Sequence, residues 1–177
     1  MDQTLDNSAE NSPGNSPGQS ATIVVESREE LLSATSGIIK QTSRTLDIVS
    51  RHLDPPIYDQ PEIIELIKQV ALGSRRAQIR IVINNIGPVI SRGHQLIDLA
   101  QRLSSYISIR VPGQSHKNFN EALLIADNSA YIHRPFADRY EGEAHYQDRG
   151  RARRLTSRFE ELWEKADTDP SLRRLHL

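Results

Sequence analysis

Residues Asn120–Asp127 read Asn-Glu-Ala-Leu-Leu-Ile-Ala-Asp, an apolar run of strand length that ends at an acidic residue. A short apolar run bounded by polar residues is typical of a buried β-strand. The pair Asn128-Ser129 predicts a two-residue turn, and Ala130–His133 then returns as the second strand of a hairpin. This hairpin decides the fold, because it follows a series in which strands and helices alternate.

The alternating series precedes the hairpin. Expected strands are residues 23–25, 46–50, 77–83 and 106–111, and expected helices are residues 27–43, 61–73 and 93–104. Ser27 and Glu30 form a capping-box pattern, and Pro61 stands at a first helical position. Strands that alternate with helices predict an α/β fold with a mixed, mostly parallel sheet flanked by helices, in which the hairpin supplies the antiparallel part.

The two ends of the chain differ from this central domain. Residues 1–21 contain a tandem Asn-Ser-Pro-Gly and almost no apolar side chains, so we expect a disordered tail. A polar loop is expected over residues 134–146. An apolar stripe between Ala152 and Ala166 predicts the last helix. We therefore expect one domain over residues 22–166 and a polar C-terminal tail over residues 167–177.

Composition narrows the possible functions. The 177 residues carry 22 Lys and Arg against 23 Asp and Glu, a formal net charge of −1, which argues against a generally basic nucleic-acid binder but allows a local basic patch. The sequence has no cysteine, which excludes disulfides and thiolate metal sites and fits a reducing, cytoplasmic location. No apolar run is long enough to span a bilayer.

The order and spacing of these elements resemble one half of the phospholipase D-like superfamily over roughly residues 27–166. The matching segments are LDIVS, PEIIELIKQVALG, AQIRIVI and YISIRV, then the strand ending at Asp127, and a closing helix with the pattern Phe159-x-x-x-Trp163. The resemblance implies an active-site motif of His-x-Lys followed by Asp on the strand ending at Asp127. It also implies a homodimer, because two such halves normally face each other.

This chain departs from that motif. When Asp127 is aligned, Asn120 stands at the histidine position and Ala122 at the lysine position. Asparagine cannot form the stable phosphoryl intermediate, and alanine carries no charge for phosphate. The resemblance therefore implies a catalytically inactive phospholipase D-like domain, which we expect to bind phosphate-bearing ligands or nucleic acid, or to act as an accessory module.

The residues near the implied pocket are candidates for ligand binding. They are Asn120, Asp127, His133, Arg134, Arg51 and His52. Arg51 and His52 leave one strand, and Asn84-Asn85 leave the next, at an edge where ligands of such sheets bind. The alternatives are structural: Asp127 as a cap of the hairpin turn, His133 as an edge-strand histidine, Arg134 as a solvated arginine, and the asparagines as turn residues.

Arginines gather in the first half of the last helix. Arg151, Arg154 and Arg158 fall in one row at helical spacing and are candidates for a nucleic-acid contact. The alternative is a solvated row that pairs with acids of the same chain, such as those at 160, 161 and 164.

Two further functions stay open at this point. One is an interaction or scaffold domain that forms a homodimer or associates with a partner enzyme. The other is an active phosphodiesterase or nuclease with a rearranged site built from His116, Lys117 and His133. We expect no cofactor and no metal, because the six histidines lack ligand spacing and no glycine-rich phosphate loop is present.

Overall fold

The computed structural model describes residues 21–116 and 118–173, and the tail expected over residues 1–21 lies almost wholly outside them. The strands are β1 (Ile23–Val25), β2 (Thr45–Ser50), β3 (Gln78–Ile83), β4 (Ile107–Pro112), β5 (Ala122–Ala126), β6 (Ala130–Arg134), β7 (Gly142–His145) and β8 (Ala166–Asp167). The helices are α1 (Arg28–Gln41), α2 (Pro55–Tyr58), α3 (Pro61–Gly73), α4 (Gly87–Arg92), α5 (Gln95–Arg102) and α6 (Arg149–Glu164), with 3₁₀ turns η1 (Gln114–His116) and η2 (Pro170–Arg173).

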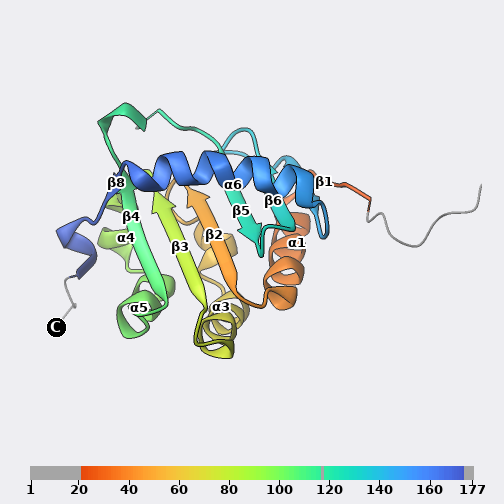
Figure 1. The fold of residues 1–177 in the computed structure, drawn as a ribbon. Helices are drawn as coiled ribbons and strands as arrows, with labels where there is room; N and C mark the ends of the chain where they lie inside the picture. Colours follow the sequence, from red (N-terminus) through yellow and green to blue (C-terminus); the bar gives the residue numbers. More distant parts are fainter. Residues whose placement is uncertain (1–20, 117, 174–177) are drawn as a thin grey trace, which may run out of the picture.

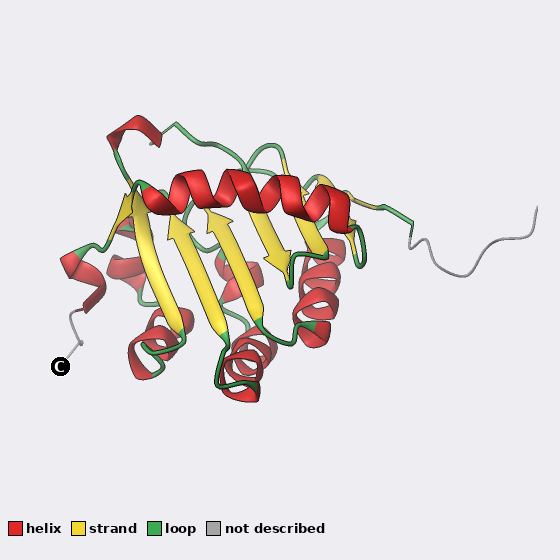
Figure 2. Ribbon diagram, in the orientation of Figure 1, coloured by secondary structure: helices red, strands yellow, loops and turns green. Residues whose placement is uncertain are grey.

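The described strands form one sheet in the order β1-β7-β6-β5-β2-β3-β4-β8, with helices on both faces (Figures 1 and 2). This confirms the α/β class and the mixed sheet. The expectation of a mostly parallel sheet is wrong, because only β2, β3 and β4 run parallel to one another. The chain passes from β4 to β5 without a crossover helix, so β5 starts at the edge where β4 ends and pairs antiparallel with β2.

The strand ending at Asp127 lies inside the sheet, as expected, between β2 and β6. Its turn differs from the expected one. Asp127 and Asn128 adopt positive φ angles of 49° and 51°, and Ser129 donates its N–H to the Ala126 carbonyl at 3.0 Å. The turn is therefore made by Asp127 and Asn128, two residue types that tolerate the left-handed region.

Local signals explain most helix boundaries. Ser27 and Glu30 form the predicted capping box of α1. The helix expected over residues 93–104 is confirmed as α5, whose cap is His94 through the Leu96 N–H. Helix α4 was not predicted, and Gly93 with φ +73° separates it from α5. The expected C-terminal tail includes β8 and η2, whose Leu172 is buried.

Helix α6 covers one face of the sheet, and the remaining helices cover the other (Figure 1). Arg80 of β3 anchors α6, because its guanidinium hydrogen-bonds to Asp47 of β2 at 2.8 and 2.9 Å and to Glu160 of α6 at 2.7 and 2.9 Å. It also lies against the rings of Phe159 and Trp163. Burial raises the pKa of Asp47, and Arg80 opposes that effect.

Candidate functional site

The ends of β2 and β3 and the start of β5 form the sheet edge where the phospholipase D-like motif would stand, and we name this edge the mouth. Asn120 is exposed just before β5, and Ala122 is the buried first residue of β5. Ala122 pairs directly with Arg134 of β6. The position of the motif lysine is therefore occupied by a methyl group beside a buried arginine.

Arg134 forms a buried ion pair at the mouth. Its Nη2 donates to Asp54 Oδ2 at 2.5 Å, and its Nη1 donates to the Arg139 carbonyl at 2.7 Å. Only 3% of Arg134 is exposed. Tyr58 interacts electrostatically with both partners, and burial raises the pKa of its phenol. Because the arginine charge is neutralised inside the protein, it is not free for a phosphate in the way the sequence suggested.

His52 and Arg51 lie on the outer side of this ion pair. His52 Nε2 is 3.4 Å from Asp54 Oδ1, so histidine, aspartate and Arg134 form one connected group. Arg51 is exposed, and its carbonyl accepts the Asn85 N–H at 2.7 Å. Asn85 accepts the Gly87 N–H, which is ordinary turn chemistry. The mouth thus brings together four predicted residues, Asn120, Arg134, Arg51 and His52.

His133 is at the same end of the sheet but faces away from Arg134, because neighbours in a strand point to opposite faces. It lies on the α6 side, where its Nε2 contacts Glu121 Oε2 at 2.7 Å and its Nδ1 lies 3.3 Å from Arg151. Arg158 also pairs with Glu121. Burial alone would raise the pKa of Glu121, but hydrogen bonds from Arg158 and His133 outweigh it and hold that pKa below its usual value.

Asp127 is at the opposite end of β5 from Asn120. Its carboxylate accepts the backbone N–H groups of Ser43, Arg44 and Thr45 at 2.7, 3.0 and 2.8 Å. It therefore ties the hairpin to the turn that leads into β2. The sequence favours a single ligand site lined by Asn120, Asp127 and His133. The structure does not bring these three residues together.

The row of Arg151, Arg154 and Arg158 on α6 is partly paired. Arg151 lies 3.4 Å from Glu143, and Arg158 pairs with Glu121, so the acids are not those expected at 160, 161 and 164. Arg154 is exposed and forms no ion pair in the described part of the chain. Arg149 and Arg153 are also exposed and form no ion pair among the described residues. The first two turns of α6 therefore carry three exposed arginines without an ion-pair partner in the described part of the chain.

The rearranged site proposed around His116 is only partly described. His116 closes η1, and its Nδ1 lies 2.8 Å from Ser115 Oγ, while Lys117 is outside the described residues. Asn84 donates to the Phe119 carbonyl, and its Oδ1 is buried without a partner among the described protein atoms. His133 and His116 have no contact in common within this part of the chain.

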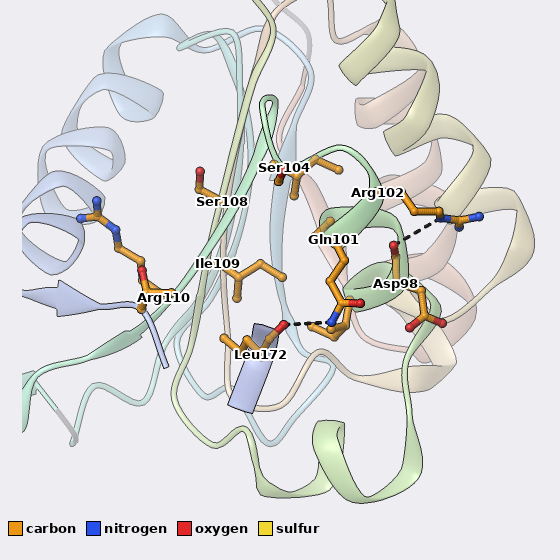
Figure 3. A pocket seen from close by; sticks show the side chains of 12 residues that line it. Asp98, Gln101, Arg102, Ser104, Ser108, Ile109, Arg110 and Leu172 are labelled. Carbon is orange, nitrogen blue, oxygen red and sulfur yellow. Dashed lines mark hydrogen bonds between the residues drawn. The ribbon is translucent and has the colours of Figure 1, made fainter. Parts of the chain in front are cut away.

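A groove lies beside β4, on the far side of β2 and β3 from the hairpin of β5 and β6. No sequence motif indicated it. It has a volume of about 810 Å³ and is bounded by α5, β4 and η2 (Figure 3). Its polar lining includes Asp98, Gln101, Arg102, Ser108 and Arg110. These residues carry no shared sequence signal, because they come together only when α5 packs beside β4.

Metal sites and membrane spans are both absent from the described residues. Residues 21–116 and 118–173 contain no cluster of three or more His, Asp or Glu side chains placed to hold a metal ion. In the same part of the chain no helix has both the length and the apolar character that a bilayer crossing requires.

The family model for a domain of unknown function, DUF7931, matches residues 27–175. The chain belongs to the DUF7931 family. No curated protein matches this DUF7931 chain. The match begins at the cap of α1 and includes β8 and η2, so the family pattern extends beyond the domain boundary expected at residue 166.

Solved structures show the fold of this DUF7931 domain. NucT from Helicobacter pylori aligns with a TM-score of 0.56 and 17% identity, over 85% of this chain and 99% of NucT. Nuc from Salmonella typhimurium, a phospholipase D family member, aligns with a TM-score of 0.54 and 13% identity, over 83% of this chain and 97% of Nuc. The fold is therefore phospholipase D-like, as the resemblance implied.

A third similar structure is TrmBL2, an archaeal chromatin protein with a novel mode of DNA binding. It aligns with a TM-score of 0.61 and 16% identity. The alignment covers 88% of this chain but only 56% of TrmBL2, so the DUF7931 domain spans a little over half of that protein.

Proposed function

We propose that this DUF7931 domain is a catalytically inactive phospholipase D-like domain that binds the phosphate backbone of nucleic acid through the start of α6. The observation that carries the proposal is the group of exposed arginines Arg149, Arg153 and Arg154, which form no ion pair within the described residues. We name these three residues the arginine patch.

The position of the arginine patch supports a ligand. The N-terminal end of a helix carries a partial positive charge, so cations there cost about 0.3–1 kcal/mol each. The first turn of α6 has no acidic residue, although Asp148 caps it by accepting the Arg151 N–H at 2.9 Å. An anionic polymer at this site would satisfy both the arginines and the helix end.

Inactivity is supported by the residues at the mouth. Asn120 offers an amide where the motif has a nucleophilic histidine, and Ala122 offers a methyl group where it has a lysine. The arginine directly across from Ala122, Arg134, is already paired with Asp54. We expect no turnover of a generic phosphodiester such as bis(p-nitrophenyl) phosphate. Turnover that disappears in His116→Ala or His133→Ala would instead establish the rearranged active site.

Binding is tested by titrating the full chain into a fluorescein-labelled duplex of about 20 bp at several salt concentrations. We expect the logarithm of the affinity to fall linearly with the logarithm of the salt concentration. Substituting the arginine patch with glutamine (R149Q, R153Q and R154Q together) should weaken binding at least ~10-fold. It should also reduce the slope by up to ~0.9 for each phosphate that the variant no longer neutralises.

A matched control removes three exposed arginines elsewhere. Arg75 and Arg76 precede β3, and Arg92 ends α4; all three are exposed. The R75Q, R76Q, R92Q variant changes the net charge by the same amount and should retain most of the affinity. Equal losses in the two variants would mean nonspecific attraction, and absence of binding to duplex or single-stranded DNA at low salt would refute the proposal.

The remaining sequence-based expectations are not required by this proposal. A homodimer, a partner enzyme and a cytoplasmic location remain predictions. The dimer is checked by sedimentation equilibrium of the full chain, in which a concentration-independent monomer mass would exclude it.

A further inference from the structure

Strand β4 has an outer edge that is only partly covered. β8 pairs with β4 at Val111 and Pro112 alone. On the inner side, Ile79 of β3 donates its N–H to the Tyr106 carbonyl, and the parallel register continues through Arg110. Because alternate residues of a strand direct their backbone groups to the same side, Ile107 and Ile109 direct theirs outward.

Within residues 21–116 and 118–173, the outward backbone groups of Ile109 are unpaired. The N–H of Ile107 reaches the Leu103 carbonyl at 2.9 Å, but neither the N–H nor the carbonyl of Ile109 has a partner among the described residues. An uncovered strand edge is a template for a further strand. Here that template lies along the groove bounded by α5 and η2.

The walls of the groove are fixed in place. The side-chain amide of Gln101 on α5 donates to the Leu172 carbonyl of η2 at 2.9 Å, which joins the two walls (Figure 3). Ile97, Ala100 and Leu172 provide apolar lining on the α5 side. Thr168, which lies between β8 and η2, also lines the groove.

The charges of the groove favour an acidic occupant. Its charged lining consists of Arg102, Arg110 and Asp98. Arg102 is exposed and donates only to the Asp98 carbonyl, while Arg110 lies 4.2 Å from the Trp163 ring centroid and donates to the Trp163 carbonyl. Neither arginine has an ion-pair partner in the described part of the chain, so the groove carries a net positive charge.

We propose that this groove binds an extended acidic peptide as an added strand on β4. The peptide continues the line of β8, hydrogen-bonds to the backbone of Ile109, and directs alternate side chains toward Ile97, Ala100 and Leu172. Its acidic residues, which alternate with the apolar ones, face Arg110 on the α6 side, and the exposed Arg102 of α5 adds positive charge to the groove. A second copy of this chain fits less well, because the β4 edge of that copy is itself flanked by α5 and η2, and the two sets of walls would meet first.

The test uses the full chain and an acetylated, amidated peptide of about eight residues. In this peptide every second residue is glutamate, and the residues between the glutamates are valine or threonine. Trp163 is the only tryptophan, and its ring contacts Arg110 of the groove, so its fluorescence reports binding directly. We expect saturable binding below ~1 mM and slower amide hydrogen exchange at Ile109 when the peptide is bound. A lysine-for-glutamate version of the peptide should bind at least ~5-fold more weakly.

Two variants separate the backbone contact from the charge contact. Ile109→Pro removes the outward N–H together with a partly buried side chain, and it should weaken binding at least ~10-fold; proline itself is tolerated on an exposed strand edge. Arg102→Glu changes an exposed side chain and should weaken binding at least ~5-fold, whereas Arg92→Glu on α4, outside the groove, should not. The comparison of Arg102→Glu with Arg92→Glu still tests the proposal if the proline variant does not fold.

The proposal fails on three outcomes. These are no binding of the acidic peptide, binding without protection of Ile109, and protection of Ile109 that appears with protein concentration in the absence of peptide. The last outcome would assign the edge to a second copy of the chain. None of them bears on the arginine patch, which belongs to a different helix.

Discussion

The mouth and the arginine patch both carry cations, but they differ in how those cations are satisfied. At the mouth, Arg134 is buried and bound by Asp54 and by a backbone carbonyl. At the start of α6, Arg149, Arg153 and Arg154 are exposed and lack an ion-pair partner within the described residues. At the place that carries the catalytic motif in the phospholipase D-like superfamily, the buried arginine is neutralised within the protein, whereas the start of α6 gathers three exposed arginines that form no ion pair among the described residues.

This difference shows why burial decides the role of an arginine. A buried guanidinium without a partner is costly, so it must be paired inside the protein and then contributes to stability rather than to ligand binding. An exposed guanidinium is hydrated at little cost and can exchange water for phosphate oxygens. We therefore expect substitutions at the mouth to change folding and substitutions in the arginine patch to change binding.

The buried ion pair should be the most sensitive position. Arg134→Met leaves Asp54 without its main partner and should lower the free energy of unfolding by about 3–5 kcal/mol. Urea denaturation followed by circular dichroism measures the loss. The R134M, D54L double variant removes both charges and should recover part of the stability, whereas a loss below ~1 kcal/mol in Arg134→Met would mean that the pair is not the constraint described above.

A smaller loss is expected at Asp127. Asp127→Asn keeps a side chain that tolerates the left-handed conformation but weakens the acceptor for three backbone N–H groups. It should therefore lower the free energy of unfolding by about 1–2 kcal/mol. Nucleic-acid affinity, measured in the same titration as for the arginine patch, should not change. A loss of affinity at unchanged stability would return Asp127 to the ligand site.

Substitution of the arginine patch should change the free energy of unfolding in the opposite direction. Substituting its three residues with glutamine removes cations from the positive end of α6 and should raise the free energy of unfolding by about 1 kcal/mol at low salt. The gain should disappear in high salt because these side chains are exposed. Thermal unfolding at two salt concentrations measures it, and a clear destabilisation would show that the arginines are structural.

The smallest effect concerns Glu121 and acid. Its pKa is lowered in the folded protein, so its stabilising contribution is present above the unfolded pKa near ~4.3 and is lost as pH falls through the lower folded value. Glu121→Gln should therefore make the fall in stability below about pH 5 shallower. The denaturant midpoints of the wild-type protein and of Glu121→Gln are recorded from neutral to acidic pH. The two curves should converge as the pH falls, and parallel curves would exclude a stabilising role of the Glu121 charge.

The sequence predicted the fold well where local signals are strong. The capping box of Ser27 and Glu30, the helix starting at Pro61 and the central strand ending at Asp127 are all present. Strands β7 and β8 were not predicted, because they are short, contain no β-branched residue and are specified by the strands beside them. The parallel part was overestimated, since the direction of β5 depends on the path of the loop from β4.

The candidate site was predicted less completely because side-chain direction depends on the register of the sheet. His133 and Arg134 are adjacent in sequence, but they face opposite sides of β6. Asn120 and Asp127 stand at two positions of the motif that the resemblance implies, yet they lie at opposite ends of a strand. Nothing in the sequence marks Asp54 as the partner of Arg134, because 80 residues separate them.

The location of the bound nucleic acid can be measured by NMR. Backbone amide signals of the ¹⁵N-labelled full chain are followed while unlabelled duplex DNA of about 20 bp is added. We predict that the largest shifts fall at residues 149–154, with little change at Arg51, Asn120 and Arg134. Shifts concentrated at those three mouth residues, with none at the start of α6, would contradict the assignment to the arginine patch and place the ligand at the mouth.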